Sequence, residues 1–69
     1  MRVRLRVKEV AAAQGLSMTR LSQRSEVAYY TIRQIYRDPY RQVTYTVLLK
    51  ISKALGVQVS DLVEEIPDD

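Results

Sequence analysis

The segment GLSMTRLSQRSEVAYYTIRQIYR, Gly15–Arg37, decides the fold of this chain. Ser17 is a good N-cap, because its hydroxyl oxygen can accept a hydrogen bond from a backbone N–H group in the first helical turn. A helix is therefore predicted over residues 18–24. After an interruption at residues 25–27, the spacing of apolar residues predicts a second helix over residues 28–37. The inward-facing residues of the two helices are Leu21, Ile32 and Ile35.

The residues before this segment allow two interpretations. Val7, Val10 and Ala11 follow helical spacing. Because Gly15 stands where a helix often ends, a helix is predicted over residues 6–14. The first seven residues, however, alternate arginine with apolar side chains, which is also typical of a short strand. A lone strand needs a partner, and no second strand is obvious in the sequence.

The residues after the segment predict two more helices. Pro39 disfavours helical geometry at the residue before it, so residues 38–43 are predicted to form a loop. Thr44 then caps a helix that Gly56 ends. Ser60 predicts the cap of a short final helix. The apolar residues of these two helices are Val47, Leu48, Ile51 and Leu55 in the first, and Leu62, Val63 and Ile66 in the second.

These elements predict an all-α fold, a compact five-helix bundle with a helix-turn-helix, and a short N-terminal strand remains the alternative for the first residues. Because the chain has only 69 residues, we expect a single domain spanning residues 1–69. Its core is expected in residues 5–66, with an acidic tail at residues 64–69.

The composition excludes several classes of function. The chain contains no Cys and no His, which removes disulfides, thiolate nucleophiles and histidine acid–base chemistry. No apolar run approaches the roughly 20 residues that a membrane-spanning helix needs, and the N-terminus lacks the apolar core of a signal peptide. We therefore expect a cytoplasmic protein that is not an enzyme and uses no metal or cofactor.

The charges are segregated along the chain. Residues 60–69 contain five acidic residues and no basic one. Residues 1–59 contain all eleven basic residues and three acids, which gives them a net charge of +8. A basic body of this kind favours a polyanionic partner. The alternative is a solvated surface that keeps a small domain in solution.

The helix predicted over residues 28–37 has a polar face in addition to its apolar one. An α-helix fits the major groove of B-DNA, where Arg pairs bidentately with guanine and Gln with adenine. A Tyr ring can contact a thymine methyl group, and its hydroxyl group can contact a phosphate. The alternative is a solvated helix face with the tyrosines partly packed on the core. The polar stripe consists of Tyr30, Arg33, Gln34 and Arg37, with Tyr29 at its N-terminal edge.

Several short motifs occur in a fixed order along the chain. They are Gly15-Leu16-Ser17, Leu21-Ser22, Val27, Thr31-Ile32 and Ile35, followed by Leu48–Val57 and Ser60-Asp61-Leu62. This set resembles the helix-turn-helix signature of the lambda-repressor-like family, the Cro and phage-repressor type also called XRE, over about residues 5–66. The resemblance implies that residues 28–37 form a DNA recognition helix and that residues 17–24 form the helix that crosses the DNA backbone.

The resemblance also implies roles for individual residues. Tyr29, Tyr30 and Gln34 match base-reading positions, and Arg33 lies on the same exposed stripe. The three arginines at positions 2, 4 and 6 form either a basic arm that reaches DNA or ordinary surface charge. The expected contacts to the DNA backbone are Ser17, Thr19, Arg20, Thr31, Arg37, Tyr40 and Arg41.

Four features depart from the family pattern. Met18 replaces a Gln that contacts DNA in many relatives, and Ala28 replaces the usual Ser cap, which removes a bond worth about 1 kcal/mol. Glu26 holds a turn position usually occupied by Gly, so it must adopt a left-handed backbone or reshape the turn. Ala11 and Tyr36 stand where relatives often pair an Arg with a Glu. We expect the ring of Tyr36 to pack over Ala11.

These observations lead to two hypotheses for the function. The first is sequence-specific double-stranded DNA binding by a small transcriptional regulator or a regulator-like antitoxin. The alternative is a protein-interaction module on the same fold, with the helix at residues 28–37 or the region of Tyr40 and Tyr45 as its surface. The sequence does not decide whether the protein binds a palindromic site as a homodimer. The fifth helix or the N-terminal segment would then form the dimer interface. The competing role of Leu62 and Ile66 is closure of the monomer core.

Overall fold

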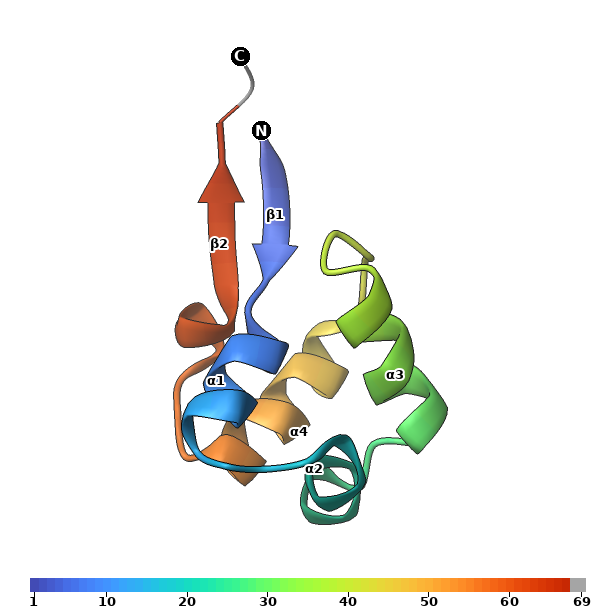
Figure 1. Ribbon diagram of the computed structural model, residues 1–69. Coiled ribbons are helices and arrows are strands. Elements are labelled where there is room, and N and C mark those ends of the chain that lie inside the picture. Colours follow the sequence, from blue (N-terminus) through green and yellow to red (C-terminus); the bar gives the residue numbers. More distant parts are fainter. Residues whose placement is uncertain (68–69) are drawn as a thin grey trace.

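The computed structural model describes residues 1–67, which form four α-helices, one 3-10 helix and a two-stranded ribbon (Figure 1). Each α-helix begins and ends within one residue of its predicted position, so these predictions are confirmed. The helices are α1 (Val7–Ala13), α2 (Met18–Ser25), α3 (Tyr29–Arg37) and α4 (Tyr45–Leu55), followed by the 3-10 helix η1 (Val59–Leu62). The strands are β1 (Arg2–Leu5) and β2 (Val63–Ile66).

Local hydrogen bonds fix the ends of α2 and α4. Ser17 Oγ accepts a hydrogen bond from the backbone N–H of Arg20 at 3.1 Å. Thr44 Oγ1 accepts one in the same way from Val47 at 3.2 Å. Each bond satisfies a first-turn N–H group that has no partner within its helix. Both caps were predicted from the sequence, and both are confirmed.

The prediction of a mostly helical fold is confirmed, but the prediction of five helices is wrong. Ser60 lies inside η1 rather than capping a helix, and Gln58 precedes η1, with its N–H donating to the Asp61 carboxylate at 2.9 Å. The chain then extends as β2 and pairs with β1 in antiparallel register, Arg2 opposite Ile66. The strand alternative is therefore correct for residues 2–5, and the helix predicted over residues 6–14 follows it as α1. Its partner lies at the other end of the chain, where local spacing could not reveal it.

The acidic residues at the end of the chain belong partly to this ribbon. Glu64 and Glu65 lie in β2, opposite Arg4 and Val3 of β1. A basic strand is thus paired with an acidic one, an arrangement in which opposite charges across strands are favourable. The last part of the predicted tail, residues 68–69, lies outside the described residues.

The core gathers side chains from every element except β2. Leu5 of β1 and Leu62 of η1 are both buried, so the two ends of the chain help to close it. Leu62 is fully buried, which confirms its role in the monomer core. Ile66, by contrast, is only half-buried. The buried apolar residues are Leu5, Val7, Ala11, Leu21, Val27, Ile32, Ile35, Leu48, Ile51, Leu55 and Leu62.

The turn between α2 and α3 contains a left-handed residue that is not glycine. Glu26 has φ of +58° and ψ of 27°, so of the two alternatives that the sequence left open, a left-handed backbone or a reshaped turn, the first is correct. Two serines support the turn. The buried Ser25 hydroxyl donates to the carbonyl of Leu21 at 2.6 Å and accepts from the N–H of Val27 at 3.3 Å. Ser22 donates its hydroxyl to the carbonyl of Val27 at 2.6 Å. These bonds hold the start of α3 in place relative to α2.

Figure 1 shows the ribbon projecting away from the helices, with the start of β1 and the end of β2 close to its tip. The loop after α3 returns toward β1, and the backbone N–H of Leu5 donates to the carbonyl of Pro39 at 2.6 Å. The ribbon is therefore joined directly to the segment that follows α3. No helix in residues 1–67 is long and apolar enough to cross a membrane.

Candidate functional site

The outward face of α3 is polar and exposed, as its spacing predicted. Ile32 and Ile35 are 0% and 2% exposed and turn into the core, whereas Tyr30 is 68% and Tyr29 44% exposed. Arg33 and Arg37 are exposed, and Gln34 and Thr31 are half-buried. All four predicted base-reading residues, Tyr29, Tyr30, Arg33 and Gln34, thus belong to one helix whose sequence contains no acidic residue.

The N-terminus of α3 lacks a side-chain cap. Ala28 precedes the helix with no side-chain hydrogen bond to it, as the sequence predicted. The first-turn N–H groups of an uncapped helix are open to an outside acceptor, and the helix dipole favours a negative one. The first turn of α3 therefore favours anions.

The start of α2 supplies a second set of candidate contacts. Arg20 and Arg24 are one helical turn apart and line a shallow hollow at the N-terminal end of α2, together with Ser17. Ser17 accepts the cap hydrogen bond with its oxygen, and its O–H group can still donate to a phosphate. Thr19 is exposed on the first turn. Such a helix start with nearby arginines can hold a phosphate.

The loop after α3 brings the remaining candidates together. Asp38 organises the loop, because its carboxylate accepts from the N–H of Tyr40 and its carbonyl accepts from the N–H of Arg41, both at 3.1 Å. Arg41 is exposed and Tyr40 is 37% exposed. The guanidinium carbon of Arg2 lies 3.8 Å from the centroid of the Tyr40 ring. No pattern in the sequence indicated this pairing.

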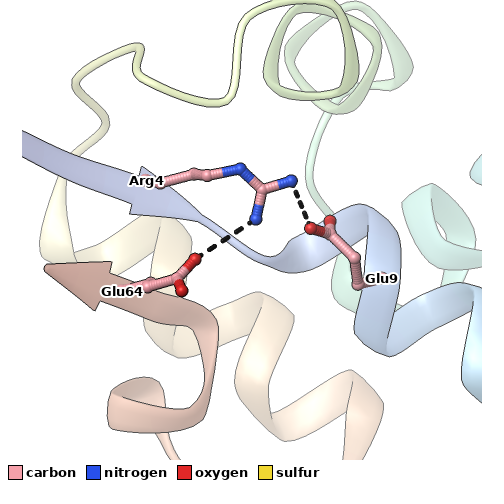
Figure 2. Close-up of polar contacts among 3 residues, drawn as sticks. All are labelled: Arg4, Glu9 and Glu64. Carbon is pink, nitrogen blue, oxygen red and sulfur yellow. Dashed lines mark hydrogen bonds and ion pairs between the residues drawn. The ribbon is translucent and has the colours of Figure 1, made fainter. Parts of the chain in front are cut away.

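Arg4 has a structural role that differs from that of Arg2. Its guanidinium forms an ion pair with Glu9 of α1 and a second one with Glu64 of β2 at 3.4 Å (Figure 2). The hydrogen bond with Glu9 is the main cause that raises the pKa of Arg4. Burial raises the pKa of Glu9, but the hydrogen bond and charge of Arg4 outweigh it, so the pKa of Glu9 is lowered. Arg4 therefore ties the ribbon to α1 instead of extending as a basic arm.

Tyr36 lies outside the polar stripe of α3. It is half-buried against the apolar core to which Ala11 belongs. Burial raises the pKa of its hydroxyl, and the nearby negative charge of Glu9 raises it further. This environment agrees with the packing role expected for the ring.

The candidate contact residues thus form three sets. The exposed face of α3 is the central set, and a set with arginine side chains flanks it on either side. The α2 start contributes one flanking set, and the loop after α3 contributes the other. Within residues 1–67, no group of three or more acidic side chains is placed to hold a metal ion. Hydrogen-bond donors and positive charge predominate, which suits a polyanion.

Comparison with known families gave one match. A family model described as a Cro/C1-type HTH DNA-binding domain matches residues 6–68, nearly the whole chain. Comparisons with the curated proteins and with the solved structures gave no significant match.

Proposed function

Because the chain belongs to the Cro/C1-type helix-turn-helix DNA-binding family, we propose that it regulates transcription by binding a specific double-stranded DNA sequence through α3. The family match confirms the resemblance seen in the sequence motifs. It supports DNA as the partner, and the family is not enzymatic. The proposal places the protein with its DNA in the cytoplasm.

The acid-free outer face of α3 carries this proposal. Arg33 presents a planar fork of donors that matches guanine O6 and N7, and the Gln34 amide matches adenine N6 and N7. Tyr29 and Tyr30 lie in the first turn, where a ring can pack on a thymine methyl group or a hydroxyl can reach a phosphate. The apolar side of α3 is buried, so the reading face is held rigidly by the core.

The groups at the two ends of α3 suit contacts with the DNA backbone. Such contacts fix the register of a protein on the duplex and carry no sequence information. Arg20 at the start of α2 would bind one phosphate. Tyr40 and Arg41 in the following loop would bind another, with Arg37 between the loop and the reading face. The half-buried Thr31 has a hydroxyl that can join the phosphate contacts near the start of α3.

Selection of bound duplexes from a random pool, followed by affinity measurements, tests the proposal. Arg33→Ala and Gln34→Ala should each weaken the binding free energy for the selected site by about 1–3 kcal/mol and reduce the preference of the protein for that site. Arg20→Ala should weaken the selected and random duplexes alike. With about four to six phosphates neutralised per protomer, log K should fall with log salt at a slope of about −4 to −5.

Lys8→Ala is the matched control, because Lys8 is an exposed cation on α1 outside the proposed interface. It removes the same unit of charge and should leave both specificity and salt slope near those of the wild type. Arg33→Ala with an unchanged site preference would contradict the assignment of the reading face.

A protein-binding role is the second candidate, favoured by exposed aromatic side chains. Tyr30 and Tyr45 are 68% and 66% exposed, and tyrosine is enriched at protein interfaces. A regulator-like antitoxin would use such a surface for its partner. A mobility-shift titration with random duplex DNA at several salt concentrations distinguishes the two roles. Weak binding with a steep salt dependence supports the DNA-binding role, whereas no binding at low salt supports the protein-binding role.

The selected sequences also test homodimer formation. A dimer with two-fold symmetry requires two half-sites related by the same symmetry. Palindromic sites would support a homodimer, and single asymmetric sites would support a monomer.

A further inference from the structure

The place where β1 passes the loop after α3 forms a positively charged corner, which we define as Arg2, Tyr40 and Arg41. The Arg2 guanidinium lies over the Tyr40 ring at 3.8 Å. The backbone bond from Leu5 to Pro39 fixes the strand against the loop. All three residues of the corner line one open hollow of about 540 Å³ between strand and loop.

The charge of Arg2 is not neutralised as that of Arg4 is. Arg4 pairs with two carboxylates, whereas Arg2 has no ion pair with any residue in the part of the chain that the structure describes. Asp38, the acid of the neighbouring loop, accepts from the N–H of Tyr40, and within residues 1–67 it forms no ion pair with Arg2 or Arg41. The corner therefore presents two guanidinium groups whose charge is available to a ligand.

Stacking on Tyr40 prepares Arg2 for an anion. A guanidinium lying over an aromatic ring is held by cation–π attraction, and its N–H donors point outward in the guanidinium plane. This planar fork matches the oxygens of a phosphate. Because the ring already restricts the side chain, less conformational entropy remains to be lost on binding.

We propose that Arg2, held over Tyr40, binds a backbone phosphate of the same duplex that α3 reads, next to the phosphate contacted by Arg41. This inference rests on the proposed DNA-binding function and extends the interface onto the N-terminal strand. That strand precedes residues 6–68, which the family model matches. The ribbon is thus a DNA-contacting element in addition to closing the core.

The salt dependence of binding to the selected duplex tests this contact. One phosphate contact contributes about 0.9 to the slope of log K against log salt. The affinity ratio of wild type to Arg2→Ala should therefore fall about 3.5-fold between about 50 and 200 mM salt. Sequence preference should not change, because a phosphate contact reads no base. Tyr40→Ala removes the stacking partner but keeps the charge of Arg2, so it should weaken binding while retaining most of the slope.

Arg6→Ala is the matched control, because Arg6 is an exposed arginine of the same segment. It should leave the slope unchanged. Arg2→Lys keeps the charge but not the planar fork, so it should bind more weakly than wild type while retaining most of the slope. It also serves as the second variant should Arg2→Ala unfold, which a thermal melt would detect.

The outcomes separate this inference from the proposed function. Equal effects of Arg2→Ala and Arg6→Ala, or an unchanged slope in folded Arg2→Ala, would overturn the Arg2 contact alone, provided that Arg33→Ala still weakens binding to the selected duplex. If the wild type binds no duplex, or if Arg33→Ala has no effect, the proposed function itself fails.

Discussion

Replacing Glu26 with glycine should stabilise the fold. Glu26 has φ of +58°, and a side chain in this left-handed region costs about 1–2 kcal/mol. Glycine avoids that cost but loses roughly 0.5–1 kcal/mol more conformational entropy on folding. The change also removes a negative charge from the C-terminal end of α2, which favours the folded state slightly. We expect a net gain of about 1 kcal/mol, or a Tm about 4–8 °C higher in a domain of this size.

Thermal unfolding followed by circular dichroism measures this gain. Glu26→Ala is the matched control, because it removes the same charge but keeps the Cβ atom. The glycine variant should melt several degrees above the alanine variant, since only glycine relieves the backbone. Equal Tm values for the two variants would refute the strain argument and assign any gain to the charge.

Three further predictions concern packing and charge. Tyr36→Glu should lower Tm, because it puts a carboxylate at a half-buried site near Glu9; an unchanged Tm would refute the packing role of the ring. Ser25→Ala should lower the free energy of unfolding in urea by about 1–3 kcal/mol, because the buried N–H of Val27 loses its acceptor. An unchanged free energy of unfolding would show that the fold does not need this bond. Burial raises the pKa of Glu9, but Arg4 outweighs this effect and lowers the pKa below its usual 4.5. The stability that the ion pair contributes is therefore fully present above pH 4.5. It is lost as the pH falls through the lowered pKa of Glu9. Arg4→Ala should make Tm less sensitive to pH below 4.5, and parallel curves for variant and wild type would contradict this.

The α-helices could be predicted because their signals are local. Ser17 and Thr44 cap the helices that follow them, and Gly56 ends α4 in the left-handed conformation. Apolar spacing placed Ile32 and Ile35 in the core and the polar stripe of α3 outside it. These features depend on residues within a few positions of one another, so the sequence alone contains them.

The ribbon could not be predicted because its signals are distributed. Val63 and Ile66 fit a helical spacing as well as a strand, and only pairing with β1 decides between them. In the candidate site, the face of α3 was predictable, whereas the stacking of Arg2 on Tyr40 was not. That contact depends on the path of β1 past the loop, which no local pattern indicates.

The pairing of β1 with β2 also bears on the order in which the molecule folds. Arg4 and Glu64 are 60 positions apart, so their contact closes almost the entire polypeptide into one loop, and distant contacts of this kind form more slowly than helices. The same strand holds Pro39 through Leu5. During synthesis, the polypeptide would therefore form its helices first. The loop that contains Pro39 would reach its final position only after β2 has left the ribosome and paired with β1.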